Sequence, residues 1–186
     1  MSNLLVMKFG GTSMGSAGRM RVAAEICARE SAGRPVVTVV SAMSKVTDLL
    51  LSTLRHAEAG DSAGLEANRE QLERRHLETC AALLPPERQP AVEAGIRGLI
   101  GEFTRIAEGM RMLGERPPRS VDEAIAIGER LSALLLAAYL ESQGLPAEAV
   151  NAAEVIVTDP VFGNATPLME PTARRAEARL RPLRRQ

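Results

Sequence analysis

The sequence predicts an α/β protein built on an open, mostly parallel sheet with helices on both faces. Two short apolar segments, residues 3–9 and 35–40, flank one amphipathic segment over residues 16–31. A strand, a helix and a second strand in this order form a βαβ unit, which requires parallel strands joined by a right-handed crossover. The long stretch 57–118 has a helical pattern, which predicts a helical insertion beside the sheet.

Composition limits the classes of protein that the sequence can encode. The 186 residues are 45% apolar and 25% charged, which favours one globular domain over residues 1–186. The formal net charge is +0 and the basic residues are scattered, so we expect neither a nucleic-acid partner nor a membrane surface. No segment resembles a secretory signal or a membrane span, and Cys27 and Cys80 lie far apart, so we expect a cytoplasmic protein with reduced thiols.

The first strand, over residues 3–9, is apolar on both faces, as in a parallel sheet covered on two sides. The helix over residues 16–31 is expected to end near Gly33. The apolar stripe of this helix consists of Met20, Ala23, Ile26 and Cys27. The second strand, over residues 35–40, is rich in valine, which favours a buried strand.

The end of the first strand carries a cation. Lys8 is followed by Gly10, Gly11, Thr12 and Ser13. Because a buried ammonium without a partner is costly, we expect Lys8 to point out of the sheet toward an anion. The glycines would let backbone N–H groups approach phosphate oxygens, and the next helix would add its positive N-terminus. The lysine precedes the glycines, so this is not a Walker A loop, and an ordinary turn with a solvent-reaching lysine is the alternative interpretation.

The second strand ends in a run of small polar residues. Ser41 follows the strand directly, and in open α/β sheets ligands bind outside the carboxyl ends of the strands, which places Ser41 near Lys8. Ser44 is predicted to be the N-cap of a helix whose first turn contains Thr47. This arrangement can hold a carboxylate. The alternative is that Ser44 and Thr47 only cap the helix.

Helices are predicted through residues 57–118, with breaks at 60–64, 85–86 and 117–118. His56 and His76 have no partners at metal-ligand spacing, so we interpret both as surface residues without chemistry. No metal site formed by side chains is predicted anywhere in the sequence.

Residues 120–123 form a capping box, in which Ser120 and Glu123 satisfy each other's backbone N–H groups at the start of a helix. The buried stripe of this helix consists of Val121, Ile125, Gly128, Leu131, Leu135 and Ala138. Glu129 lies beside that stripe, and an acid so close to a core needs a partner. The sequence leaves two roles open for Glu129: a salt bridge at the helix flank, or contact with a ligand.

The last part of the chain is predicted to contain two short strands, a turn and a helix. The strands are expected over residues 147–152 and 154–158. Phe-Gly-Asn-Ala at 162–165 predicts a turn, and residues 171–185 predict a basic helix.

Four separated motifs resemble those of the aspartokinases, a branch of the amino acid kinase family. Lys-Phe-Gly-Gly-Thr-Ser, within residues 7–13, is similar to the opening signature of these enzymes. Residues 39–50 contain a Val-Ser-Ala segment followed by a threonine and a leucine pair, residues 128–132 resemble the Gly-Glu-x-x-Ser motif, and residues 162–165 resemble a family turn.

The resemblance implies transfer of the γ-phosphoryl group of ATP to the side-chain carboxylate of L-aspartate, a step in lysine, threonine and methionine synthesis. It implies Mg²⁺ as the companion of the nucleotide. By resemblance, Lys8 is catalytic and stabilises charge on the phosphoryl group, while Ser41, Thr47 and Glu129 bind aspartate. The residues implied around the nucleotide are Lys8, Phe9, Gly10, Gly11, Thr12 and Ser13.

The resemblance spans nearly the whole chain but only the first part of the family's catalytic domain. The Gly-Phe-Ile-Gly strand, the Gly-Arg-Gly-Gly-Ser-Asp loop and the nucleotide-binding half of aspartokinases have no counterpart in the 186 residues. We therefore expect an incomplete catalytic domain without turnover of its own. The alternative is a non-catalytic or split kinase half that binds substrate or a partner, such as a second copy or a complementary kinase fragment.

Overall fold

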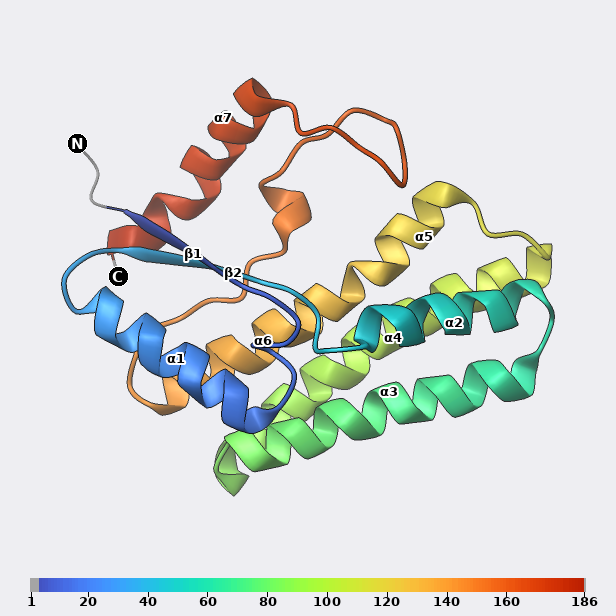
Figure 1. Ribbon diagram of the computed structural model, residues 1–186, viewed down its shortest axis with the longest axis horizontal. Helices are drawn as coiled ribbons and strands as arrows, with labels where there is room; N and C mark the ends of the chain where they lie inside the picture. Colours follow the sequence, from blue (N-terminus) through green and yellow to red (C-terminus); the bar gives the residue numbers. More distant parts are fainter. Residues whose placement is uncertain (1–3, 186) are drawn as a thin grey trace.

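The computed structural model describes residues 4–185 and places a small parallel sheet beside a layer of helices (Figure 1). Strand β1 (Leu5–Phe9) pairs with β2 (Val36–Val40) in parallel, and the register runs from Leu5 opposite Val36 to Phe9 opposite Val40. Helix α1 (Ala17–Ser31) connects them. The predicted βαβ unit is therefore confirmed, although Asn3, the first residue expected in β1, lies outside the described residues.

Helix α1 begins one residue after the predicted start, with Ser16 as its N-cap. Ser16 is extended, and its hydroxyl accepts a hydrogen bond from the Arg19 N–H at 3.4 Å. The buried face consists of Met20, Ala23, Ala24 and Cys27, while Ile26 is only half-buried. The Cys27 thiol lies 3.3 Å from the Thr38 hydroxyl of β2, which fixes α1 against the sheet.

The two faces of the sheet have different surroundings. Met7 and Phe9 of β1 and Val40 of β2 pack against the main core. On the opposite face, Val6 and Val39 are 60% and 47% exposed. Within residues 4–185 the sheet has two strands, and these two valines on its second face remain largely exposed.

The remaining elements are helices. They are α2 (Val46–Glu58), α3 (Ser62–Leu83), α4 (Gln89–Leu113), α5 (Pro118–Ile125), α6 (Ile127–Ser142) and α7 (Met169–Leu180), with short 3₁₀ helices η1 (Pro86–Arg88), η2 (Ala152–Glu154) and η3 (Pro182–Arg185). The stretch 57–118 consists of helices joined by short loops, with no strand. In the described part of the chain, no helix is long and apolar enough to span a membrane.

One hydrophobic core joins α1, α2, α3, α4 and α6. Its largest fully buried side chains include Met14, Met43, Leu50, Phe103 and Leu131. Met14 and Met43 come from the loops that follow β1 and β2, so these loops are anchored in the core rather than held at the surface. Their conformations are consequently coupled to the packing of the helices.

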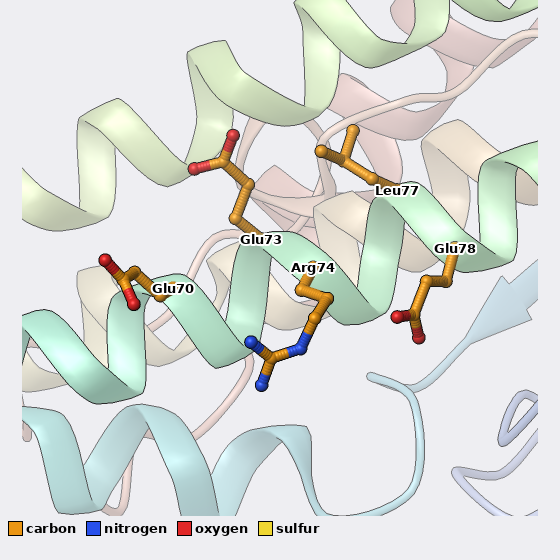
Figure 2. A pocket seen from close by; sticks show the side chains of 5 residues that line it. All are labelled: Glu70, Glu73, Arg74, Leu77 and Glu78. Carbon is orange, nitrogen blue, oxygen red and sulfur yellow. The ribbon is translucent and has the colours of Figure 1, made fainter.

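Ion pairs connect the outer faces of α3 and α4. The Glu73 carboxylate accepts hydrogen bonds from Arg69 at 2.9 Å and from Arg97 of α4 at 3.1 Å. A hollow of about 390 Å³ lies along α3. Figure 2 shows the side chains that line it, of which Glu73 and Arg74 point in opposite directions. None of the predicted site residues lines this hollow.

The strands expected over 147–152 and 154–158 are wrong. Residues 152–154 form η2, and Thr158 makes one isolated antiparallel bridge to Pro167. The backbone N–H of Val157 donates to the Thr172 hydroxyl of α7 at 2.9 Å instead of to a neighbouring strand. Apolar β-branched residues favour a strand locally, but contacts to α7 satisfy this backbone without one.

The helix start predicted at Ser120 is also wrong. Helix α5 begins at Pro118, with Pro117 before it, and Ser120 lies within its first turn. The fixed φ angle of proline is close to the helical value, so a proline is favoured at the first helical position and α5 begins upstream of the capping box. The stripe expected on one helix is divided between α5 and α6, which Ala126 separates.

His76 is buried, which corrects its interpretation as a surface residue. Its side chain is 0% exposed, and its Nδ1 lies 2.7 Å from the Leu72 carbonyl, which accepts the hydrogen bond. Nε2 has no hydrogen-bond partner within residues 4–185. Burial lowers the pKa of His76 below its ordinary value of 6.5, because protonated Nε2 would be a charged donor without an acceptor.

We expect the free energy of unfolding to fall as the pH drops below about 6.5, the ordinary histidine pKa. The unfolded chain then binds a proton that folded His76 excludes, so stability is lost from that pH down to the lower pKa of the folded state. The slope from this residue is at most about 1.4 kcal/mol per pH unit. Urea unfolding at pH 7.5 and pH 5.5 measures it. The change should be smaller in His76→Leu, and equal changes in both proteins would contradict this account.

Candidate active site

The carboxyl ends of β1 and β2 bring two predicted loops together. The Ser41 N–H donates to the Phe9 carbonyl at 3.0 Å. A Cβ added to Gly11 would lie 3.1 Å from the Ala42 carbonyl oxygen, and one added to Gly15 would lie 3.2 Å from the Ser44 Cβ. Because neither position has room for a larger side chain, Gly11 and Gly15 allow the two loops to pack directly on each other.

The glycine loop presents backbone donors without acceptors. The Gly10 carbonyl accepts from the Met14 N–H at 3.1 Å, and the Thr12 carbonyl accepts from the Gly15 N–H at 3.3 Å. Within residues 4–185, no acceptor lies in hydrogen-bond range of the N–H groups of Gly11, Thr12 or Ser13. Consecutive free N–H groups just before a helix N-terminus form a site suited to phosphate oxygens.

Lys8 lies at the start of this loop. Its ammonium is 3.6 Å from the position that a Cβ on Gly10 would occupy, so the side chain leans toward the glycines. Lys8 is exposed and makes no ion pair within the described range. The positive charge therefore remains available to an anion at the loop.

Helix α6 brings Glu129 to the same edge of the sheet. The Ala42 N–H donates to Glu129 Oε1 at 3.3 Å, while in residues 4–185 Oε2 accepts no hydrogen bond. The neighbouring Arg130 pairs with Glu102 at 2.6 Å, and Glu129 itself forms no salt bridge with any described residue. Of the two roles that the sequence left open, the structure gives no support to the flank salt bridge. One carboxylate oxygen is held by the backbone and the other is free.

Gly128 makes this contact possible. A Cβ at Gly128 would lie 2.8 Å from the Ala42 Cβ and 3.3 Å from side-chain atoms of Val46 and Leu50. The absence of a side chain lets α6 pack directly against the loop after β2. The sequence predicts that Gly128 lies in the buried stripe, but it cannot identify Ala42 as the group that approaches.

The predicted N-cap at Ser44 is wrong. Helix α2 begins at Val46, whose N–H donates to the Met43 carbonyl at 2.9 Å, and Lys45 precedes the helix in the left-handed region with φ of 64°. This tight turn places Ser44 against Gly15 instead of at the helix terminus. Thr47 does lie in the first turn of α2 and is half-buried, as is Ser41.

The turn predicted at 162–165 is present and docks on α5. The Gly163 N–H donates to Asp122 Oδ2 at 2.7 Å, and the Arg119 guanidinium lies 5.9 Å from the centre of the Phe162 ring. Gly163 has φ of 80°, a conformation that favours glycine. These contacts belong to α5 and involve none of the predicted site residues.

Sequence reasoning missed the backbone N–H of Ala42, which contacts Glu129, as a functional group. An alanine side chain gives no information about the partner of its backbone N–H, so the sequence could not identify the Ala42 amide. Gly10 and Gly11 did predict a backbone-lined site, whereas Gly15, which packs against Ser44, was not singled out.

Comparison with known proteins identifies relatives of this arrangement. Residues 3–181 match the Amino acid kinase family. The chain is 31% identical to the bifunctional aspartokinase/homoserine dehydrogenase 1, chloroplastic, of Arabidopsis thaliana, over 86% of this chain and 17% of that protein. It is 34% identical to an aspartokinase of Chlamydia trachomatis serovar D, over 88% of this chain and 34% of that protein. The chain thus spans about a third or less of the length of these relatives.

Solved structures share the fold. Escherichia coli aspartokinase III in complex with aspartate and ADP matches with a TM-score of 0.87 and 24% identity, over 98% of this chain and 39% of that one. The aspartate kinase of Clostridium acetobutylicum matches with a TM-score of 0.69 and 21% identity, over 95% and 36% of the two chains. The similarity to aspartokinases expected from four short motifs extends over almost the whole fold, and the chain belongs to the amino acid kinase family.

Proposed function

We propose that the chain forms the aspartate-binding edge and the phosphate-contacting loop of an aspartokinase, which transfers the γ-phosphoryl group of ATP to the side-chain carboxylate of L-aspartate. One observation carries the proposal: Glu129 of α6 reaches the Ala42 N–H after β2, and Ala42 in turn packs on Gly11 after β1. Three motifs far apart in the sequence therefore lie at one edge. The E. coli structure in complex with aspartate and ADP supports the same assignment.

Aspartate carries an ammonium and two carboxylates, and the edge offers groups suited to each charge. The free Oε2 of Glu129 would accept from the ammonium, while the hydroxyls of Ser41 and Thr47 would donate to the α-carboxylate. The side-chain carboxylate would then face the Lys8 ammonium and the free N–H groups of the glycine loop. Positioning the two reactants in this way is the main task in phosphoryl transfer.

The loop residues fit a nucleotide. The free N–H groups of Gly11, Thr12 and Ser13 can donate to phosphate oxygens, and Lys8 can offset the charge that develops on the transferring group. Mg²⁺ would be held through the phosphates of ATP, where it neutralises charge. Among residues 4–185 no three acidic, histidine or cysteine side chains cluster as ligands for a metal ion.

Aspartate-dependent ADP release tests the proposal. Because the chain spans 39% of the E. coli enzyme, we expect a chimera in which residues 3–181 replace the matching segment of that enzyme to release ADP only when L-aspartate is present. The 186-residue chain by itself should show no measurable turnover, because it supplies only part of the ligand crevice. A folded chimera without aspartate-dependent activity would contradict the proposal.

Glu129→Gln and Thr47→Val should raise the KM for aspartate in that chimera by roughly tenfold to a hundredfold, because each removes a hydrogen bond to a charged group of the substrate. The kcat should change less than the KM, since these contacts form before the transition state. Glu141→Gln is the matched control, because Glu141 is an exposed glutamate at the far end of α6. A wild-type KM in both site variants would show that these residues do not bind aspartate.

A second candidate is a non-catalytic or split kinase half that associates with another polypeptide. The exposed Val6 and Val39 on the open face of the sheet favour it, because apolar strands without a covering layer tend to associate. Size-exclusion chromatography of the chain would show an oligomer if this face pairs with a second copy.

The expected cytoplasmic location also stays a prediction, since the A. thaliana relatives are described as chloroplastic.

A further inference from the structure

Arg19 lies in the first turn of α1 and reaches back to the glycine loop. One of its guanidinium nitrogens, Nη1, donates to the Thr12 carbonyl at 3.0 Å. The same carbonyl accepts from the Gly15 N–H at 3.3 Å, so two donors hold one oxygen. The Arg19 N–H donates to the Ser16 hydroxyl, which fixes the start of the helix that carries the guanidinium.

Holding the Thr12 carbonyl also sets the direction of a donor. The described residues contain no cis peptide bond, and in a planar trans peptide the C=O and the following N–H point in opposite directions. The N–H of Ser13 must therefore point away from Arg19. By the same geometry, the Gly10 carbonyl, which accepts from the Met14 N–H, turns the Gly11 N–H outward.

The two outward N–H groups differ in how they are held. The Gly10 carbonyl is held by Met14, whose side chain is buried in the core. Among residues 4–185, the Thr12 carbonyl is held only by the Gly15 amide and Arg19, and Thr12 and Ser13 are both exposed. Without Arg19, a loop with glycines at three of six positions, 10–15, would have one anchor on this side and would sample other conformations.

We propose that Arg19 is a positioning residue, which acts through the Thr12 carbonyl to keep the Ser13 N–H directed toward a phosphate group. The inference deepens the proposed function and rests on it for the identity of the anion. The order of the free loop is a separate property that can be measured without any ligand.

Amide proton exchange in the 186-residue chain tests the claim by NMR. In Arg19→Ala, exchange at Gly15, whose N–H donates to the Thr12 carbonyl, should rise roughly tenfold, the effect of losing a hydrogen bond from a charged donor, while Met14 and amides in α4 keep their rates. Arg19→Lys retains a cation and should restore part of the protection. Arg29→Ala is the matched control, because Arg29 lies on the same helix with its side chain 72% exposed. Equal loop rates in Arg19→Ala and Arg29→Ala would overturn the inference.

MgADP titration of the chimera with E. coli aspartokinase III provides the second measurement. The dissociation constant should rise several-fold in Arg19→Ala, stay unchanged in Arg29→Ala and recover in part in Arg19→Lys. A loosened loop with unchanged MgADP affinity would overturn the link to phosphate binding. If the folded, unmodified chimera binds no MgADP while the loop of the 186-residue chain still loosens in Arg19→Ala, the proposed function fails and the role of Arg19 in ordering the loop stands.

Discussion

Lys8→Ala should lower the kcat of aspartate-dependent ADP release by roughly a hundredfold to a thousandfold in the chimera with E. coli aspartokinase III, with little change in the KM for aspartate. The Lys8 ammonium lies beside Gly10 at the start of the loop, and no described residue pairs with it. Its charge is therefore available to the phosphoryl group, where charge develops in the transition state.

Steady-state kinetics at saturating MgATP with varied aspartate measure both parameters. Lys8→Arg keeps the charge and should retain more of the kcat than Lys8→Ala. A raised KM with an unchanged kcat in Lys8→Ala would assign the lysine to substrate binding and contradict its proposed catalytic role.

Gly128→Ala should destabilise the chain by about 1–3 kcal/mol and raise the KM for aspartate in the chimera. Replacing glycine by alanine inside a helix ordinarily stabilises it by about 0.5–1 kcal/mol, so the expected sign is reversed here. The reason is local, because the new Cβ would meet the Ala42 Cβ at 2.8 Å. Moving α6 outward would lengthen the contact between Glu129 and the Ala42 N–H.

Gly98→Ala is the matched control for this substitution. Gly98 lies inside α4, and a Cβ added there meets no atom within 4 Å, so this variant should be as stable as the unmodified chain or more so. Urea unfolding compares the two variants directly. A stabilised Gly128→Ala with an unchanged KM would show that close approach at this glycine does not position Glu129.

Local sequence signals identified the βαβ unit well. Two apolar strands and the helix between them lie within residues 4–40, so short-range patterns were enough to predict β1, α1 and β2. The orientation of Lys8 was predicted by the same reasoning, because burying an unpaired ammonium is costly and a lysine near the carboxyl end of a strand can point out of the sheet.

Contacts between distant segments were not accessible to that reasoning. His76 has the spacing of a helix residue with polar neighbours, and only the packing of α3 against the other helices buries it. Ser44 is a good capping residue by type, but Gly15 packs on it and the helix begins at Val46. The apolar run ending at Thr158 has a strand-like composition, yet α7 supplies the hydrogen bond that a neighbouring strand would have made.

In the candidate site, too, local signals were predictable from the sequence and contacts between distant segments were not. The side chains of Lys8, Thr47 and Glu129 were singled out by motif, whereas their arrangement depends on two close approaches by glycines. Gly11 admits the loop after β2, and Gly128 admits α6. A glycine in a sequence can indicate that another group packs closely against the backbone. Only the fold shows that this group is Ala42 at both Gly11 and Gly128.

Titration of the ¹⁵N-labelled chain with L-aspartate tests most directly whether the converging motifs form an aspartate site. The account predicts chemical-shift changes centred on the backbone amides of Ser41, Ala42, Thr47 and Glu129, and a weaker response in Glu129→Gln, whose uncharged amide cannot pair with the ammonium. Unchanged amides at millimolar L-aspartate, or changes centred on another part of the chain, would contradict it.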